Sequence, residues 1–484
     1  MKYMIAVDQS TSGTKVALFN ERLEKVRSLQ KHHRQFYPQA NWAEHDAQEI
    51  WCNTVSMLTQ IAEGIPKSDI AGIGLTNQRE TSVIWERSTG VPLCNAIVWQ
   101  DTRAKKHCDA LAPHSDRIFR LSGLRPSPYY SAGKVSHLLH SNPEYRQRAG
   151  NGELCFGTID SYLLYRLTSG KSFFTDMTNA SRTQLMDIER LEWSDELARF
   201  FDIPLSMLAQ KILPADAVFG VVDAVPALSG VPIVAMLGDS HASFFGQNCL
   251  KKGMVKTSFG TGSSIMMNIG EKPVWAEKGL STSVGIAWGE RVYYALEGNV
   301  TCSADTLVWI KDYLHLIDDM GQLGEAASVD SSEGVYLVPA FSGLGAPWFQ
   351  ENAKAVLYGM NRGTTRAHVL RAALASIAHQ NADVLDAMSE STGIPITCIR
   401  ADGGGCTNPL LVQMQSDYVP CEVIASTEKD LTLRGIARMA GISAGIFDGN
   451  MHAEYDAVHY TPKMNESQRL VERTGWMDAV RRCM

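Results

Sequence analysis

The chain has 484 residues, of which 45% are hydrophobic and 20% charged, and its net charge is -7 at pH 7. This length exceeds one ordinary core and predicts two domains of about 200 residues each, with an extra segment. The modest charge, with no cluster of Lys and Arg interleaved with aromatic residues, argues against a nucleic-acid or anionic-membrane surface and favours a small-molecule ligand.

The beginning of the chain predicts a cytoplasmic protein, because the apolar run from Met1 reaches Asp8 too soon for the core of a secretory signal peptide. The most apolar long stretch, residues 218–237, contains Pro226 and Pro232, which buried strands tolerate better than a membrane helix does. The ten Cys residues are scattered, with no Cys-x-x-Cys pair and no zinc spacing, so we expect reduced core residues.

A strand, a polar turn and a returning strand open the chain. Residues 3–7 and 15–19 are rich in apolar side chains, and the turn between them reads Asp8-Gln9-Ser10-Thr11-Ser12-Gly13-Thr14. Backbone amides, short hydroxyls and a glycine after a buried strand allow the close approach of a phosphate chain, and the Asp8 carboxylate suits a hydrated Mg²⁺ ion. An ordinary polar hairpin is the alternative interpretation of this segment taken alone.

Strands and helices then alternate. Asp46 is a predicted N-cap, with Glu49 three residues on and apolar residues at 50, 57, 58 and 61, which is helical spacing. Strands are predicted at 70–75, 83–85 and 96–99. This alternation is typical of an α/β domain.

A second unit begins near Gln247 and repeats the opening plan. Strand 255–259 leads to the polar turn 260–264, and further on a helix at 366–388 precedes a strand at 396–400 and the glycine-rich turn 402–405. Weak self-similarity of this kind predicts two related α/β halves. A peripheral helix is expected at 467–482.

Several long segments form an ordered set along the chain: residues 74–81 (Gly-Leu-Thr-Asn-Gln-Arg-Glu-Thr), 95–100 (Asn-Ala-Ile-Val-Trp-Gln), 157–160, 178–183 and 338–347. In these segments the sequence resembles the FGGY carbohydrate kinases, and within them the glycerol kinases most closely. The resemblance implies an α/β fold of two ribonuclease-H-like (actin-like ATPase) domains with an ATP cleft between them. We expect an N-terminal domain at 1–246, a C-terminal nucleotide-binding domain at 247–449 and a peripheral segment at 450–484.

The resemblance implies that Asp239 is the catalytic base that receives the proton of the attacking hydroxyl. The alternative is that Asp239 only caps a helix starting near Ser240, because Gly-Asp-Ser is good cap chemistry. The resemblance implies these substrate-binding residues: Arg79, Glu80, Trp99, Tyr129, Asp239, Ser240 and Ser264. It implies these nucleotide-binding residues: Thr11, Thr14, Thr261, Gly262, Gly404, Gly405 and Asn408. Asp8 is the expected Mg²⁺ ligand, through water.

Two of these positions depart from the glycerol kinase pattern. Ser240 stands where Gln is usual, and Ser264 stands where an aromatic residue is usual. Small polar side chains at both positions widen the pocket and predict an acceptor of four to six carbons.

The predicted function is ATP-dependent, in-line phosphorylation of a hydroxyl of a small polyol or sugar, with ATP and Mg²⁺ as cofactors. Glycerol kinase proper is one alternative, and an ATP-gated binding or sensor protein on the same scaffold is another, because fold alone does not fix function. A cytoplasmic homo-oligomer, dimer or tetramer, is expected from the resemblance, without a nucleic-acid or membrane partner.

Overall fold

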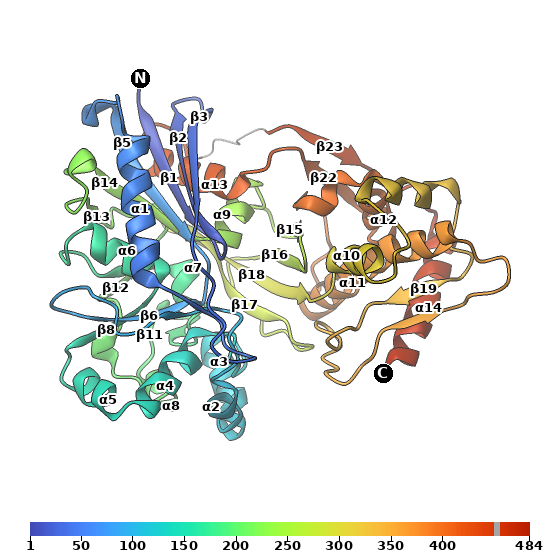
Figure 1. The fold of residues 1–484 in the computed structure, drawn as a ribbon, viewed down its shortest axis with the longest axis horizontal. Coiled ribbons are helices and arrows are strands. Elements are labelled where there is room, and N and C mark those ends of the chain that lie inside the picture. Colours follow the sequence, from blue (N-terminus) through green and yellow to red (C-terminus); the bar gives the residue numbers. More distant parts are fainter. Residues whose placement is uncertain (450–454) are drawn as a thin grey trace.

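The computed structural model describes residues 1–449 and 455–484, which form two lobes (Figure 1). The first lobe is built on a six-stranded sheet with the order β13-β14-β5-β1-β2-β3. Its strands are β1 (Tyr3–Gln9), β2 (Gly13–Asn20), β3 (Lys25–His32), β5 (Ile70–Asn77), β13 (Gly220–Val221) and β14 (Pro232–Gly238). β1 runs antiparallel to β2 and parallel to β5, which lies parallel to β14.

The second lobe is built on a seven-stranded sheet with the order β17-β18-β16-β15-β21-β22-β23. Its strands are β15 (Met254–Phe259), β16 (Ser263–Gly270), β17 (Ser281–Trp288), β18 (Arg291–Val300), β21 (Cys398–Asp402), β22 (Glu422–Ser426) and β23 (Ala457–Tyr460). As in the first sheet, a run of antiparallel strands, here ending at β15, is followed by two parallel ones, β21 and β22. This shared topology confirms the predicted α/β class with two ribonuclease-H-like domains.

Helices cover both faces of the first sheet. α1 (Ala47–Ile61) and α6 (Ile159–Leu167) pack on one face, in a core with Val7, Leu75 and Met236. α1 begins where the sequence predicts, because the Asp46 side chain accepts the backbone N–H groups of Gln48 and Glu49.

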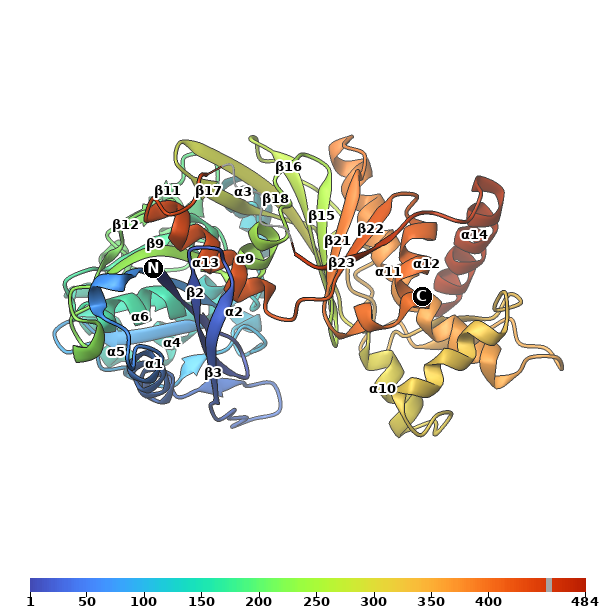
Figure 2. The same cartoon turned by 90° about the horizontal axis from the view of Figure 1, so that it is seen from above.

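The opposite face is covered by α9 (Asp239–Gly246) and α13 (Leu431–Ser443). α13 comes from the far end of the chain, yet it lies on the first lobe (Figure 2). A Cβ atom on Gly435 of α13 would lie 1.9 Å from the carbonyl oxygen of Ala242 in α9, so only glycine permits this crossing.

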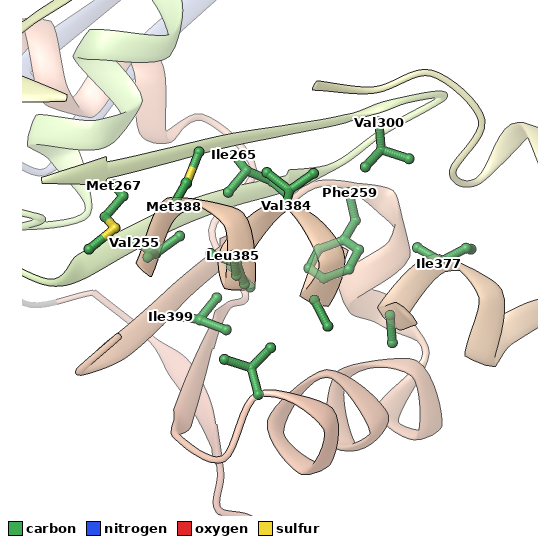
Figure 3. Close-up of a cluster of buried hydrophobic side chains, with 14 of the residues drawn as sticks. Val255, Phe259, Ile265, Met267, Val300, Ile377, Val384, Leu385, Met388 and Ile399 are labelled. Atoms are coloured by element: carbon green, nitrogen blue, oxygen red, sulfur yellow. The ribbon is translucent and has the colours of Figure 1, made fainter. Parts of the chain in front are cut away.

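The core of the second lobe lies between its sheet and α11 (Arg366–Thr392), as Figure 3 shows. Ile265 and Met267 of β16 point into this core beside Val384 and Met388 of α11. The helix predicted at 366–388 is confirmed and continues to Thr392, where Gly393 follows with φ 66°.

The C-terminal segment contains a strand that the sequence does not predict, in addition to the predicted helix. β23 pairs antiparallel with β22 and so extends the second sheet, while α14 (Glu466–Cys483) packs against β19 (Tyr336–Val338). In the described parts of the chain, none of the helices has the length and hydropathy that crossing a membrane requires.

Candidate active site

The carboxyl edge of the first sheet brings together the predicted Mg²⁺ ligand and three residues predicted to bind the acceptor. Asp8 lies near the end of β1, Arg79 and Glu80 follow β5, and Asp239 follows β14 directly. The register places the ends of these three parallel strands side by side. Ligands of open α/β sheets bind at this edge.

Asp239 lies between a cation and a second carboxylate. Its Oδ1 is 3.4 Å from Nε of Arg79 and accepts the backbone N–H of Ser240 at 2.6 Å. Its side chain is 33% exposed, whereas Asp8 is only 8% exposed. Burial and the like charge of Asp239 raise the pKa of Asp8 to about 7. The two carboxylates are therefore close enough to repel each other, and Asp239 is the more exposed of the two.

The capping role considered for Asp239 is not seen. The N-cap position of α9 is Gly238, and Asp239 is the first helical residue. Among the described residues its carboxylate accepts a hydrogen bond only from the N–H of the next residue, through Oδ1.

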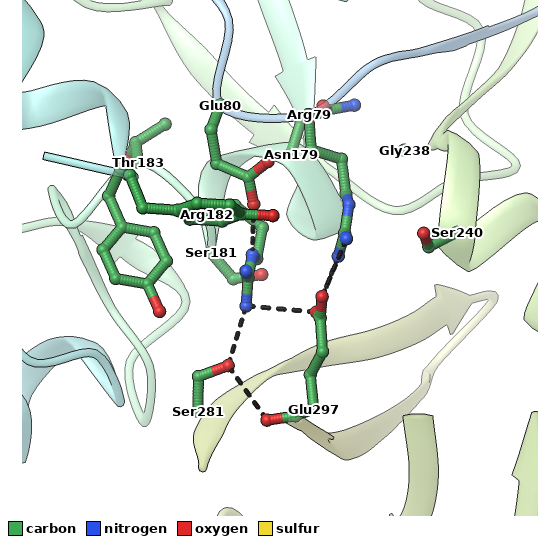
Figure 4. Close-up of polar contacts among 12 residues, drawn as sticks. Arg79, Glu80, Asn179, Ser181, Arg182, Thr183, Gly238, Ser240, Ser281 and Glu297 are labelled. Carbon is green, nitrogen blue, oxygen red and sulfur yellow. Dashed lines mark hydrogen bonds and ion pairs between the residues drawn. The ribbon is translucent and has the colours of Figure 1, made fainter. Parts of the chain in front are cut away.

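Four buried charged side chains link the two sheets beside Asp239 (Figure 4). The guanidinium of Arg79 forks onto Glu297 of β18, with Nη1–Oε2 at 2.7 Å and Nη2–Oε1 at 2.8 Å. Arg182 donates from Nε to Oε1 of Glu80 at 2.6 Å and lies 3.2 Å from Oε2 of Glu297. This network fixes Arg79 against the second sheet.

Burial alone would raise the pKa of Glu297, but Arg182 and Arg79 hold it below its ordinary value. Burial raises the pKa of Glu80 despite the same two cations. Arg79 and Glu80 are 6% and 2% exposed, so they are not a solvated surface pair. Because an unpaired buried charge is costly, each member of this network depends on the others.

Sequence reasoning missed the roles of Arg182 and Glu297. Arg182 lies in the quoted segment 178–183, but that segment gives no partner for it. Glu297 follows the apolar run 292–296 of β18, and a carboxylate at a buried strand position is the signal that could have found it.

An aromatic wall borders the network. The ring centroids of Trp99 and Tyr129 are 5.7 Å apart, and Nε1 of Trp99 donates to Oγ1 of Thr11 at 2.9 Å. The buried ammonium of Lys134 holds the loop of Tyr129, because it donates to the carbonyl oxygens of Pro128 at 2.8 Å, Tyr130 at 3.3 Å and Tyr129. Trp99 and Tyr129, both predicted to bind the substrate, thus lie beside Arg79 and Glu80.

The predicted nucleotide-side turns also lie beside each other. β15 runs parallel to β21, so the turn at Gly260–Gly262 lies next to Gly403–Gly405. Gly403 has φ 93°, and a Cβ atom there would lie 2.5 Å from the carbonyl oxygen of Phe259, whereas one on Gly404 meets nothing within 4 Å. Thr261 and Gly404 are exposed, as a nucleotide site requires.

Thr14 and Asn408, two other residues predicted to bind the nucleotide, have structural roles of their own. Thr14 is fully buried on β2 opposite Gln9, and the side chain of Asn408 caps α12 (Pro409–Tyr418) by accepting the N–H of Leu411 at 3.1 Å. Their nucleotide contacts stay predictions.

The residues around Asp8 fit a magnesium ion. Its Oδ1 is buried and has no hydrogen-bond partner in the described part of the chain. Within residues 1–449 and 455–484 no group of three or more His, Cys, Asp or Glu side chains could hold a metal. Mg²⁺ needs no such cage, since it takes one or two carboxylates together with waters and phosphate oxygens.

Comparisons with known proteins agree with this geometry. Family models for the N-terminal and C-terminal domains of the FGGY family of carbohydrate kinases match residues 3–246 and 255–444. The chain is 40% identical to a glycerol kinase of Shewanella amazonensis over 491 residues, covering 100% of this chain and 99% of that protein. A crystal structure of Plasmodium falciparum glycerol kinase with ADP superposes with a TM-score of 0.94 at 33% identity, covering 100% of this chain and 98% of that one. A ligand-bound xylulose kinase of Lactobacillus acidophilus, 21% identical with a TM-score of 0.88 over 99% of this chain and 97% of that one, shares the fold.

Proposed function

The chain belongs to the FGGY family of carbohydrate kinases and phosphorylates a polyol or sugar with ATP, and from this premise we propose that Asp239 is its catalytic base. The observation that carries the proposal is the Asp239 carboxylate, which is open to solvent, oriented by Arg79 at 3.4 Å and placed beside the buried Asp8.

In the proposed reaction one carboxylate oxygen of Asp239 accepts the proton of the acceptor hydroxyl. The hydroxyl oxygen forms a bond to the γ-phosphorus of ATP while the bond from that phosphorus to the bridging oxygen breaks, and ADP leaves with the electron pair. A positioned base of this kind adds about 10² to 10⁴ in rate. Alignment of the two substrates supplies much of the remainder.

Asp8 would hold Mg²⁺ through water, next to the phosphates. The ion supplies charge neutralisation of the β- and γ-phosphate oxygens when bound. The unpaired Oδ1 of Asp8 supports this role. The pKa of about 7 supports it as well, because the ionised carboxylate is unfavourable at this site by itself and a nearby cation would stabilise it.

We propose the two adjacent glycine turns as the nucleotide site. Thr261, Gly262, Gly404 and Gly405 lie at the carboxyl edge of the second sheet, after β15 and β21. Thr11 and Thr14 flank the phosphates in this proposal, and Asn408 completes the site through the first turn of α12.

Glycerol kinase proper is the second candidate, supported by the 40% identity to curated glycerol kinases over the whole chain. A screen of polyols, ketoses and aldoses for acceptor-stimulated ADP formation tests both. An acceptor-dependent rate supports a kinase, and its ranking separates glycerol from other acceptors. Nucleotide binding without ADP formation for any acceptor would favour the sensor alternative.

We also propose that the protein is a cytoplasmic homo-oligomer and that the boundary between its two domains lies near residue 246. We also propose domain closure about the segments near Gln247 and Phe341, because an open site lets water compete with the acceptor.

A further inference from the structure

A row of polar side chains crosses the second sheet beside the candidate active site. The register places Ser258 of β15 opposite Ser264 of β16, and Ser264 opposite Asn299 of β18. Ser258 also lies opposite Asp402 of β21. Four adjacent strands therefore each contribute one polar residue to the same line.

This row lies on the face of the second sheet that packs against α9. Ile265 and Met267 point to the opposite side, into the core under α11 (Figure 3). Met266 and Ala295 instead pack against Phe244 of α9. Because successive side chains of a strand alternate between faces, Ser264 and Asn299 share the face of Met266 and Ala295.

The row continues directly from the reacting centre. Glu297 holds Arg79 on the same face of β18, two residues before Asn299, at about 6 to 7 Å along the strand. Ser240 is half-buried on α9, next to Asp239, and its hydroxyl lies on the side of Arg79 (Figure 4). At the far end Asp402 accepts hydrogen bonds from Ser243 at 2.8 Å and Gln247 at 2.7 Å, which closes the row.

Two members of the row have hydrogen-bonding capacity to spare. Oγ of Ser264 is buried and has no partner among the described residues, and no described residue hydrogen-bonds the exposed side chain of Asn299. A hydroxyl offers one donor and two acceptor positions, and a carboxamide offers both donors and an acceptor. A chain of neighbouring hydroxyl groups, each of which donates and accepts, matches this pattern.

We propose that Ser240, Ser264 and Asn299 form a second acceptor subsite, which binds the additional hydroxyl groups of a linear four- to six-carbon polyol or open-chain sugar. The inference rests on the proposed kinase function and names its acceptor class. A three-carbon triol has no hydroxyl left for this subsite once Asp239, Arg79 and Glu80 are engaged. Asn299 and Ser264 are thus the residues that determine acceptor length.

The test is kcat/KM for glycerol, a tetritol and a pentitol, measured as ADP formation by the full chain. The wild type should favour the best longer acceptor over glycerol by at least about 10-fold. Ser264→Ala and Asn299→Ala should each lower that preference about 10-fold, the effect of one lost hydrogen bond. Ser264→Phe should lower it further, because the ring fills the subsite. Ser263→Ala is the matched control: this neighbour faces away and bonds Ser303 at 2.8 Å, so the preference should not change.

The outcomes distinguish a failure of the proposed subsite from a failure of the proposed kinase function. Glycerol as the best acceptor of the wild type, or an unchanged preference in both Asn299→Ala and Ser264→Phe, would overturn the subsite and leave the kinase function intact. A series in which no acceptor is phosphorylated overturns the proposed function, and the subsite with it. A thermal unfolding curve for each variant shows whether a change in ranking comes from a folded protein.

Discussion

Asp8→Asn should make the ligand-free protein more stable at neutral and alkaline pH while removing its function. Burial and the charge of Asp239 raise the pKa of Asp8 from 3.8 to about 7. The folded state therefore binds a proton that the unfolded state has released, and the stability associated with that proton is lost as the pH rises from 3.8 through 7. The difference between a pKa of 3.8 and one of about 7 corresponds to an upper limit of about 4 kcal/mol above pH 7.

The assay is thermal unfolding from pH 4 to pH 8, with and without Mg²⁺ and ATP. Without ligand the variant should unfold at a higher temperature at pH 8, and its advantage should shrink toward pH 4, because near the unfolded-state pKa of 3.8 the unfolded chain begins to take up the same proton. With Mg²⁺ and ATP the wild type should gain more than the variant, because Asp8 carries the proposed metal site. An equal melting temperature at pH 8, or equal stabilisation by Mg²⁺ and ATP, would refute the reasoning.

Three further predictions follow from the contacts of the site. Glu297→Gln leaves the buried charges of Arg79 and Arg182 without their counter-ion, so it should cost about 3 to 5 kcal/mol in the free energy of unfolding and raise KM for the acceptor. Denaturant unfolding and acceptor kinetics check this, and an unchanged free energy of unfolding with an unchanged acceptor KM would contradict it. Lys134→Met removes the donor that holds the loop of Tyr129, so acceptor KM should rise at least about 10-fold with nucleotide affinity retained. Acceptor kinetics measure the change in KM, and calorimetry measures the nucleotide affinity. Small-angle scattering should show compaction only with nucleotide and acceptor together, and equal radii in all states would count against closure.

Local chemistry made much of this structure predictable from the sequence. The turn from Asp8 to Thr14, the helix capped by Asp46 and the glycine turn after residue 401 depend on nearby residues, and each lies where its pattern placed it. The repeated strand-turn-strand plan indicated two related sheets because each copy is a local hairpin.

The features that the sequence did not predict depend mainly on contacts between distant segments. Arg79 meets Glu297 across 218 positions, and only the packed sheets bring them together. α13 crosses back to the first lobe because Gly435 allows a close approach to α9, which no periodicity reveals. β23 is short and half-exposed, so its hydrophobic pattern is too weak to mark it as a strand.

The most direct test of the account is Asp239→Asn, which keeps the size of the side chain but removes the base. ADP formation with the best acceptor should fall at least about 10²-fold, while nucleotide affinity measured by calorimetry stays within about twofold of the wild type. A parallel loss of nucleotide affinity would assign Asp239 a structural role, and a turnover close to the wild-type value would show that another group receives the proton.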